Sequence, residues 1–300
     1  MKQNCTEKTT YRGRFAPSPS GELHFGSLLA SMASYADARK NNGSWLLRID
    51  DIDLARVAAD SDLHIIKTLE QCGFQWDEKI SYQSQCMGRY QQALEKLQQA
   101  NITYPCFCSR KQIKALAHNG IYPGTCRNKS FNKSVQPYAI RIKVSTDEIS
   151  FVDQIQKIYS QQLNQSVGDF VIFRRDQVFT YQLSVVVDDY LSQISHVVRG
   201  NDLLASTPRQ IYLQQQLGYP KPQYAHIPLA VTHDNLKLSK LSHAKKVVCD
   251  LQTLVLAAEF LGQDIMKHMD YQTKEDFWRH LFINWDINNV PKMAKQEILY

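Results

Sequence analysis

The apolar positions of the first hundred residues follow two different spacings. Residues 11–15 (YRGRF) and 44–49 (SWLLRI) are short runs with the length and composition of strands. Between them, from Leu28 to Lys40, apolar residues recur at helical spacing, and Asn42-Gly43 predicts where that helix ends. A second helix is expected at about 58–72, stopped by Gly73. The order of strand, turn, helix, strand and helix predicts βαβ units on a parallel sheet, and so an α/β fold.

The pattern changes after a third helix, which is expected at about 87–100. From 103 to 166 the chain is irregular, with extended pieces such as YAIRIKV (138–144), and this predicts an inserted subdomain. Strand and helix patterns then return in the runs DFVIFR, YQLSVVVDDYL and SHVVRG. The chain is therefore divided into two halves of a main domain (1–102 and 167–230), the insert (103–166), and a lysine-rich loop with helices (231–300).

Composition narrows the class of protein. The formal charge of +6 and the pI of about 8.8 are compatible with a polyanionic partner, although the excess is modest for a dedicated nucleic-acid binder. The polar start of the chain and the lack of long apolar windows predict a cytoplasmic, globular protein. Cys106, Cys108 and Cys126 cluster among seven cysteines, which argues against a disulfide framework and for thiol or metal chemistry.

The segment RFAPSPSGELHFG (14–26) is dense in turn-forming residues and leads from a strand into a helix. Such a junction places free backbone N–H groups and the positive end of a helix dipole at one spot, which favours a phosphate. The segment lacks the P-loop and the dinucleotide-binding glycine patterns. It offers instead His24 beside Gly26, where histidine can donate to a phosphate oxygen. The alternative is a loop histidine with a purely structural role.

A second basic element lies far along the chain. The run NLKLSKLS (235–242) places Lys237 and Lys240 three residues apart in a polar loop, where both ammonium groups could reach a triphosphate. Alone, such a run is usually a solvated surface. An early His-x-Gly and a late Lys-x-Ser-Lys together indicate one nucleotide held from two sides.

These segments resemble the class I glutamyl-tRNA synthetases. RFAPSPSGELHFGSL is similar to their first signature, usually written around HIGH, and KLSKL (237–241) resembles their KMSKS loop. Further family blocks match in the right order: LLRIDDID (46–53), FTYQLSVVVDD (179–189) and HVVRGNDLL (196–204). The resemblance implies a Rossmann-like parallel sheet and ATP bound with Mg²⁺. It also implies catalytic roles for His24, Gly26, Lys237 and Lys240, with His24, Gly26 and Lys240 at the ATP.

Within that family, the chain is similar to the glutamyl-queuosine tRNA(Asp) synthetases. About sixty residues follow the KMSKS-like loop, too few for the anticodon-binding region of a full glutamyl-tRNA synthetase. This resemblance implies that L-glutamate is activated with ATP and attached to the queuosine base in the anticodon of tRNA(Asp). It also implies a helical C-terminal region that contacts an RNA stem. A monomer is expected.

The same resemblance implies a structural Zn²⁺ in the insert, with Cys106, Cys108, Tyr122 and Cys126 as ligands. Two thiolates on one extended strand, followed by a turn that delivers two more groups, can close a tetrahedron around zinc. The phenol of Tyr122, with an ordinary pKa of about 10, must be polarised to bind well, and His118 or a water could replace it. The alternative is three reduced cysteines without a metal.

For glutamate, the resemblance implies that Arg14, Phe15, Ala16, Pro17, Ser18, Asp50, Tyr181 and Arg199 form the site. An arginine matches a carboxylate with two hydrogen bonds, and the acid of LLRIDDID takes the ammonium. Here the chain departs from the family, which usually has glutamate where Asp50 stands. The shorter side chain implies either a weaker contact of the same kind, including one through water, or a pocket adjusted by the backbone.

Three other functions are compatible with parts of the sequence. One is a short glutamyl-tRNA synthetase that charges the 3′ end of tRNA(Glu), and another is a nucleotidyltransferase of the His-x-Gly-His type, although residue 27 is serine. The third is a degenerate synthetase that only binds RNA. Basic residues that could follow an RNA backbone on any RNA-binding interpretation are Arg127, Lys129, Lys133, Lys245 and Lys246.

Overall fold

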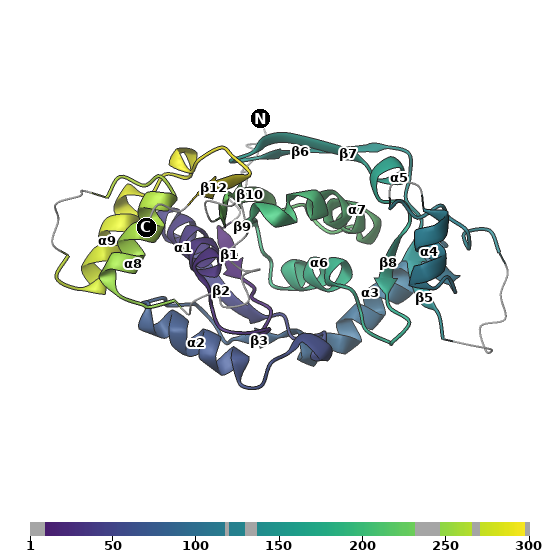
Figure 1. Cartoon of the computed structure of the whole chain (residues 1–300), viewed down its shortest axis with the longest axis horizontal. Helices are drawn as coiled ribbons and strands as arrows, with labels where there is room; N and C mark the ends of the chain where they lie inside the picture. Colours follow the sequence, from purple (N-terminus) through teal and green to yellow (C-terminus); the bar gives the residue numbers. More distant parts are fainter. Residues whose placement is uncertain (1–9, 118–119, 130–136, 232–246, 266–270, 298–300) are drawn as a thin grey trace, which may run out of the picture.

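A parallel sheet organises the first half of the chain, with helices on both of its faces (Figure 1). The computed structural model describes residues 10–117, 120–129, 137–231, 247–265 and 271–297. Strand β1 (Arg12–Phe15) is parallel to β2 (Ser44–Ile49), which is parallel to the short β3 (Ser81–Tyr82). Helix α1 (Phe25–Lys40) connects β1 to β2, and α2 (Ser61–Gln71) follows β2. The predicted βαβ unit is confirmed.

The second half of the chain extends the same layer. Strand β9 (His196–Gly200) is parallel to β10 (Gln223–Ile227), and β10 is parallel to β6 (Glu148–Asp153), whose hairpin partner is β7 (Lys157–Gln162). The N–H of Ser195, just before β9, donates to the carbonyl of Arg12 in β1 at 3.0 Å. This bond holds the two halves side by side, so that the carboxyl ends of β1 and β9 lie close together.

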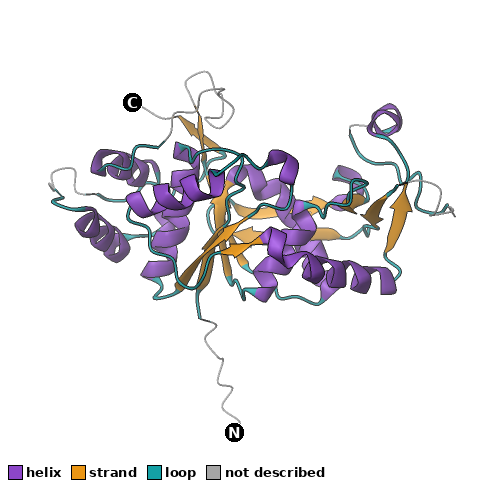
Figure 2. Ribbon diagram, turned by 90° about the horizontal axis from the view of Figure 1, so that it is seen from below, coloured by secondary structure: helices purple, strands orange, loops and turns teal. Residues whose placement is uncertain are grey.

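Two hydrophobic cores lie on opposite faces of this sheet. Val197 packs in one core and the next residue, Val198, packs in the other, as strand pleating requires. Helices α1, α8 (Leu251–Phe260) and α9 (Lys274–Asn284) cover one face, and the other is covered by α3 (Met87–Gln99), α6 (Tyr181–Leu191) and α7 (Thr207–Leu217). Figure 2 shows helices on both sides of the strands. Burial on both faces explains why the strands read as nearly continuous apolar runs.

A small antiparallel sheet stands at the edge of the molecule, beside α4 (Arg110–Leu116) (Figure 1). Its strands are β4 (Thr103–Cys106), β5 (Ala139–Ile142) and β8 (Phe170–Phe173). The remaining regular elements of the described residues are α5 (Leu163–Ser166), the parallel pair β11 (Leu229–Val231) and β12 (Lys295–Glu297), and the 3₁₀ turns 54–56, 83–86, 201–206 and 287–289.

The insert that the sequence predicts at 103–166 contributes to two sheets. Strands β4 and β5 belong to the edge sheet, whereas the β6–β7 hairpin joins the central layer through the pairing of Asp153 with Tyr224. The division of the chain into four parts stays a prediction.

The sequence argues against a disulfide framework, and the structure has one disulfide among the described cysteines. Cys72, at the end of α2, is joined to Cys249, although the two are separated by 177 positions in the sequence. The fold brings α2 against the segment before α8, which sequence spacing could not reveal. No helix within the described ranges has the length and apolarity that crossing a bilayer requires.

Candidate active site

A cavity of about 390 Å³ opens at the N-terminus of α1, where β1 ends. His24 is the N-cap of this helix: its Nδ1 accepts the backbone N–H of Ser27 at 3.2 Å, and the Ser27 hydroxyl lies 3.2 Å from its Nε2. The lining residues are Phe15, Pro17, Ser18, Ser20, His24, Gly26, Ser27, Ala30, Gly200, Asp202 and 227–230. The helix dipole and the amides of the first turn therefore face a space that fits an anionic ligand.

Gly26 is needed for the position of the His24 ring. A Cβ added at Gly26 would lie 3.1 Å from Cε1 and 3.2 Å from Nδ1 of His24, closer than an ordinary van der Waals contact. The glycine thus allows the imidazole to fold over the start of the helix. The sequence pattern His-x-Gly has this local steric reason.

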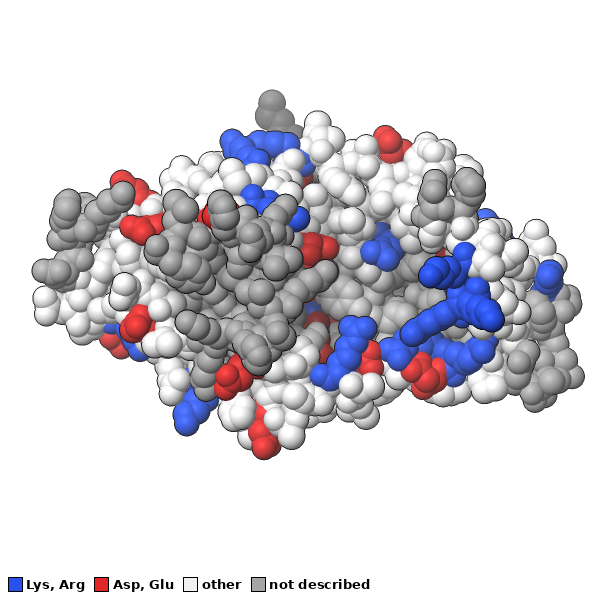
Figure 3. Space-filling model, viewed as in Figure 1, with Lys and Arg blue, Asp and Glu red and all other residues white. Residues whose placement is uncertain are grey.

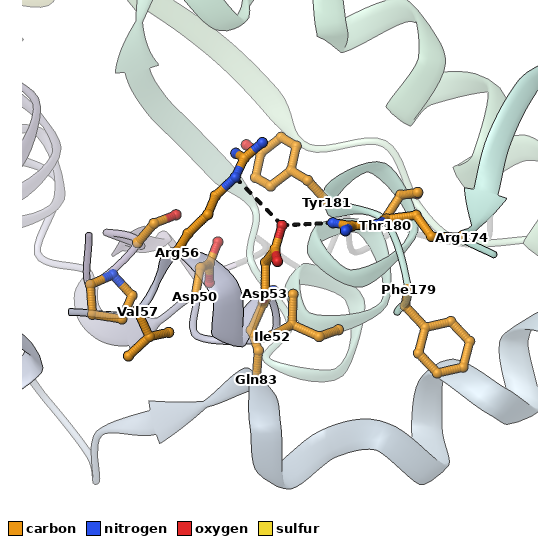
Figure 4. A pocket seen from close by; sticks show the side chains of 12 residues that line it. Asp50, Ile52, Asp53, Arg56, Val57, Gln83, Arg174, Phe179, Thr180 and Tyr181 are labelled. Atoms are coloured by element: carbon orange, nitrogen blue, oxygen red, sulfur yellow. Dashed lines mark hydrogen bonds and ion pairs between the residues drawn. The ribbon is translucent and has the colours of Figure 1, made fainter. Parts of the chain in front are cut away.

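A second cavity of about 270 Å³ adjoins the first, because Ser18 lines both. Figure 4 shows its acidic and aromatic side chains, with Asp50 and Tyr181 on its walls. Ser18, Asp50 and Tyr181 are three of the residues that the sequence predicts for glutamate. The full lining is Ser18, Pro19, Asp50, Ile52, Asp53, Arg56, Val57, Gln83, Arg174, Phe179, Thr180 and Tyr181.

An ion-pair bridge links two sides of this second cavity. The Asp53 carboxylate accepts a hydrogen bond of 2.7 Å from Nη1 of Arg174, and it lies 3.5 Å from Nε of Arg56. Figure 4 shows both contacts. The Arg56 side chain is 79% exposed, whereas Arg174 is 32% exposed and also pairs with Asp176. The bridge joins the loop after β2 to the turn after β8.

Asp50 belongs to a buried network of charges beneath the cavity. Arg48 lies among three carboxylates, with distances of 2.7 Å from its Nε to Asp50, 2.7 Å from Nη1 to Asp189 and 3.7 Å from Nε to Asp188. Burial raises the pKa of Asp50 to about 6, against the opposing effect of Arg48. Asp188 also accepts the Tyr90 hydroxyl and the side-chain amide of Gln83.

Arg14 lies in the same network rather than in the lining of either cavity. Its guanidinium makes two hydrogen bonds to Asp189, of 3.1 and 3.2 Å, in the paired geometry that favours carboxylates. Burial acts to raise the pKa of Asp189, but Arg14 and Arg48 outweigh it and hold this pKa below its usual value. Asp189 therefore stays ionised and fixes both arginines.

Arg199 is held from several directions behind Tyr181. Its Nε donates to Nε2 of His226 at 3.0 Å, and its Nη2 donates to Thr207 and Gln210, each at 2.8 Å. Its Nη1 lies 3.5 Å from the Tyr181 hydroxyl, and Tyr181 faces the cavity. The guanidinium is thus one side chain away from the cavity that holds Asp50.

His226 orients Arg199 as a neutral ring. Burial lowers the pKa of His226 to about 4, and its Nδ1 lies 2.6 Å from Asp153. A neutral ring that accepts from Arg199 at Nε2 carries its proton on Nδ1, so Nδ1 donates to Asp153. The β6–β7 hairpin, which supplies Asp153, therefore supports the position of Arg199.

The predicted residues separate into three groups. Ser18, Asp50 and Tyr181 line the second cavity, and Phe15, Pro17, His24 and Gly26 line the first. Arg14 and Arg199 lie behind these walls, and Ala16 is half-buried outside both linings. Lys237 and Lys240, which are predicted to be catalytic, lie outside the described residues, as do His118, Lys133, Lys245 and Lys246.

Several polar residues of the site were not singled out from the sequence. Arg48 stands inside the apolar strand SWLLRI, and Asp188 and Asp189 end the apolar stretch LSVVV. Charged residues inside apolar runs are costly to bury without partners, so their placement was a usable signal. The other residues missed are Asp53, Arg56, Gln83, Arg174 and His226.

Three thiols and one phenol converge in the edge sheet. The ligand atoms of Cys106, Cys108 and Cys126 all lie within 4.8 Å of one another, and the Cys108 and Cys126 sulfurs are 3.5 Å apart. The Tyr122 oxygen lies 3.4 Å from the Cys106 sulfur and 3.8 Å from the Cys108 sulfur. The backbone N–H of Cys126 donates to the same oxygen at 3.0 Å. This cluster could hold a metal ion.

Comparisons with known proteins agree with this geometry. Residues 10–257 match the family described as tRNA synthetases class I (E and Q), catalytic domain. The chain is 44% identical to glutamyl-Q tRNA(Asp) synthetase of Dechloromonas aromatica, covering 95% of this chain and 97% of the relative. The protein of the same name from Acinetobacter baylyi is 42% identical, with 96% of each chain covered.

Solved structures share the fold. Glutamate-tRNA synthetase from Elizabethkingia anophelis superposes with a TM-score of 0.80 at 24% identity, over 96% of this chain and 68% of the other. The family match and the two relatives place the chain in the class I (E and Q) tRNA synthetase family, and within it the chain belongs to the glutamyl-Q tRNA(Asp) synthetases.

Proposed function

We propose that this protein activates L-glutamate with ATP and transfers it to the queuosine base in the anticodon of tRNA(Asp). The observation that carries the proposal is its similarity to proteins named glutamyl-Q tRNA(Asp) synthetase over nearly the full length of both chains. The two adjoining cavities support it, because one suits the phosphates of a nucleotide and the other suits a small charged amino acid.

In the first step, an α-carboxylate oxygen of glutamate attacks the α-phosphorus of ATP. A new oxygen–phosphorus bond forms, the bond to the bridging oxygen of the β-phosphate breaks, and pyrophosphate leaves. His24 and the first-turn amides of α1 stabilise the charge on the phosphates, and Lys237 and Lys240 are predicted to do so from the other side. Mg²⁺, carried in with ATP, neutralises phosphate charge.

Glutamate is held in the second cavity in this proposal. The ionised Asp50 accepts hydrogen bonds from the ammonium group, Ser18 and Tyr181 supply hydroxyls, and Arg199 attracts the side-chain carboxylate from behind Tyr181. Arg48 determines where Asp50 points, since its Nε lies 2.7 Å from the carboxylate. Ser18 lies at the boundary of the two cavities, where the carboxylate must meet the phosphate.

In the second step, a hydroxyl of the queuosine ring attacks the activated carbonyl carbon. An ester bond forms, the bond to the phosphate oxygen breaks, AMP leaves, and the hydroxyl proton is released. The base must leave the stack of the anticodon loop to reach the cavity, as enzymes that modify bases require.

Transfer of radiolabelled glutamate tests the proposal. The protein and ATP are incubated with tRNA(Asp) that contains queuosine, with tRNA(Asp) that lacks it, and with tRNA(Glu). Label is expected on the first RNA alone. Label on tRNA(Glu) but not on queuosine-containing tRNA(Asp) would indicate the short glutamyl-tRNA synthetase instead.

For the cysteine cluster, we propose a structural Zn²⁺ held by Cys106, Cys108, Tyr122 and Cys126. Two ligands of a tetrahedral zinc with Zn–S bonds of about 2.3 Å are about 3.8 Å apart. The Cys108 and Cys126 sulfurs, 3.5 Å apart, are close to this edge, and no two of the three sulfurs are more than 4.8 Å apart. The Tyr122 oxygen lies 3.4 and 3.8 Å from two of these sulfurs. The N–H that Cys126 donates to the Tyr122 oxygen would stabilise a phenolate ligand. Such an ion would tie β4 to the turn at 122–126.

Metal analysis tests the zinc site. Purified protein is expected to contain zinc, and the double variant Cys106→Ser, Cys126→Ser is expected to lose it. Cys86→Ser is the matched control, because Cys86 is a free cysteine on a different element, the turn before α3. Equal zinc in the wild type and the double variant would contradict the site.

A further inference from the structure

A third cavity, of about 760 Å³, runs from the glutamate cavity to the cysteine cluster. It shares Arg56, Arg174 and Thr180 with the glutamate cavity, and its other end is lined by Cys106 and Cys108. Five arginines line this groove and one acidic residue does: Arg56, Arg110, Arg141, Arg174, Arg175 and Asp176. We call this cavity the arginine groove. Its lining carries a clear excess of positive charge.

Two of these arginines have their hydrogen-bonding groups occupied. Arg141 is buried, donates to the carbonyl of Asp169 and to the Cys106 sulfur, and stacks 3.7 Å from the centre of the Tyr122 ring. Arg174 pairs with Asp53 and Asp176. The single acid of the lining is therefore already paired with Arg174, and the lining keeps an excess of positive charge.

The outer arginines present open donors. Arg110 and Arg175 are exposed, and within the described residues no hydrogen bond or ion pair engages the Arg110 guanidinium. One nitrogen of Arg175 donates to the carbonyl of Phe107 at 2.6 Å, which aims the guanidinium over the groove and leaves its other N–H groups facing solvent. Arg56 is 79% exposed and has one long ion pair. A guanidinium with free N–H groups matches a phosphate with two hydrogen bonds.

The surface view places this charge on the half of the molecule that contains α4 and β8. Lys and Arg side chains gather there on the face seen in Figure 3. The rings of Phe107 and Tyr138 pack together with centroids 5.4 Å apart, and neither ring lines the groove. The charge of the lining therefore comes from arginine donors, which suit an RNA backbone whose phosphates need cations.

We propose that the arginine groove binds the phosphodiester backbone of the anticodon loop, with Arg110 and Arg175 as phosphate contacts. This inference rests on the proposed function. When a base enters the glutamate cavity, the phosphates on either side of it must stay outside, at the rim of that cavity. Arg56 and Arg174 stand at this rim, because they line both the glutamate cavity and the groove. The groove continues from that rim to Arg110 and Arg175. The contacts are to the backbone, so they position the RNA without reading its sequence.

The test is the salt dependence of RNA binding. The dissociation constant of fluorescently labelled, queuosine-containing tRNA(Asp) is measured over a series of NaCl concentrations. For Arg110→Gln, Arg175→Gln, the constant is expected to rise about ten-fold at low salt. Its logarithm is expected to depend less steeply on the logarithm of salt concentration, by about 1.4, since each phosphate contact to a single strand contributes about 0.7.

Matched variants separate charge from structure. Arg279→Gln removes an exposed arginine from α9, at the other end of the molecule, and is expected to leave the slope unchanged (Figure 1). Arg110→Lys, Arg175→Lys keeps the charge and is expected to keep the slope. The proposal is overturned if the slope of the glutamine variant equals that of the wild type, or if the lysine variant loses as much slope as the glutamine variant.

Two further outcomes would point to a different ligand or a different function. If the groove binds pyrophosphate instead of RNA, the glutamine variant will bind pyrophosphate more weakly and tRNA as tightly as the wild type does. This result would overturn the RNA assignment. A wild-type protein that binds no tRNA(Asp) would contradict the proposed function itself. Normal binding by the wild type with an unaltered slope in the variant would contradict the groove alone.

Discussion

The arginines near the glutamate cavity form two sets with opposite surroundings. Arg14, Arg48 and Arg199 are buried, and their donors are taken by Asp189, Asp50, His226 and neighbouring oxygens. Arg56, Arg110 and Arg175 lie at the rim or in the groove, exposed and mostly open. The first set has its geometry fixed before any ligand arrives. The second set can still gain partners from outside.

This difference suggests a division of roles. A buried arginine that is surrounded by carboxylates cannot give up its partners cheaply, so it shapes the cavity and holds Asp50 or Tyr181 in place. An exposed arginine gives up only water when a phosphate approaches, and its affinity depends on salt. Variants of the two sets should therefore differ in the quantity they change: stability and glutamate affinity for the first, RNA affinity for the second.

The largest effect is expected for Arg48→Met. The substitution leaves Asp50, Asp188 and Asp189 buried without their shared cation. The free energy of unfolding at neutral pH should fall by about 3–5 kcal/mol, as found when one partner of a buried ion pair is removed. Urea unfolding followed by tryptophan fluorescence measures it. Arg56→Met is the matched control and should change stability by less than about 0.5 kcal/mol. Equal losses in the two variants would break the comparison.

The next effect is a pH dependence of glutamate binding. With the pKa of Asp50 raised to about 6 by burial, its carboxylate gains a proton as pH falls through 6 and no longer accepts from an ammonium. The Michaelis constant for glutamate should rise about ten-fold at pH 5, one unit below that pKa. Asp50→Asn should have a high Michaelis constant that is flat over this range. A flat profile in the wild type would remove Asp50 from the ammonium site.

The same shift has an opposite consequence for stability. Because the pKa of Asp50 is higher in the folded chain than its ordinary value, protonation favours the fold, and the contribution of Asp50 to stability is lost as pH rises through about 6. Asp50→Asn should therefore reduce the pH dependence of the unfolding free energy between about pH 4 and pH 6, the interval between the ordinary and the folded pKa of this carboxyl. Asp50→Glu, which restores the residue usual in the family, tests whether the shorter side chain weakens glutamate binding. An unchanged Michaelis constant would mean that its length is not critical.

A smaller effect is expected for Thr207→Val, which removes one hydrogen bond to Arg199. The hydroxyl of Thr207 accepts from Nη2 of Arg199 at 2.8 Å, and the valine keeps the shape of the side chain. The Michaelis constant for glutamate should rise several-fold, which is less than a full hydrogen bond to a charged group is worth, because Arg199 keeps its bonds to His226 and Gln210. Thr68→Val is the control, since Thr68 is buried in α2 and donates to His64 within that helix. A similar rise in both variants would argue against a specific role for Arg199.

The smallest effect is expected for Asp53→Asn at the cavity rim. Its carboxylate is 24% exposed and its partners Arg56 and Arg174 are exposed further, so stability should change by less than about 1 kcal/mol. The loss of this acid frees Arg56 and removes one of the two carboxylates that pair with Arg174, and tRNA(Asp) should bind a few-fold more tightly. Titration of labelled tRNA at fixed salt measures it. Weaker binding would mean that the bridge itself orders the rim for RNA.

The elements of the sheet could be predicted from the sequence because their apolar spacing is strong. β1, β2 and α1 lie within a few residues of the positions expected, and the His24–Gly26 turn opens a cavity at the start of α1. Local pattern suffices there, since the residues that meet are neighbours along the chain.

The buried charge network could not be predicted in the same way. Asp189 is 141 positions from Arg48 and 175 from Arg14, and only the fold brings them together. The sequence also cannot tell an arginine that lines a cavity from one that lies behind it. For that reason Arg14 and Arg199 were expected to contact glutamate directly. In the structure Arg14 is bonded to Asp189, and Arg199 lies beside the Tyr181 hydroxyl. One signal was available in the sequence: a charged residue inside or at the end of an apolar run is costly to bury, and Arg48 and Asp189 stand at such positions.

The pairing of β11 with β12 gives the first cavity, at the N-terminus of α1, a distant reporter. Leu229 and Ala230 of β11 line that cavity, and the same strand is bonded to residues 295–297 near the end of the chain. A ligand that steadies the cavity wall should also slow the exchange of amide protons with deuterium in β12. Peptides from the last strand, about sixty residues away in sequence from the wall they support, would then record whether the nucleotide is bound.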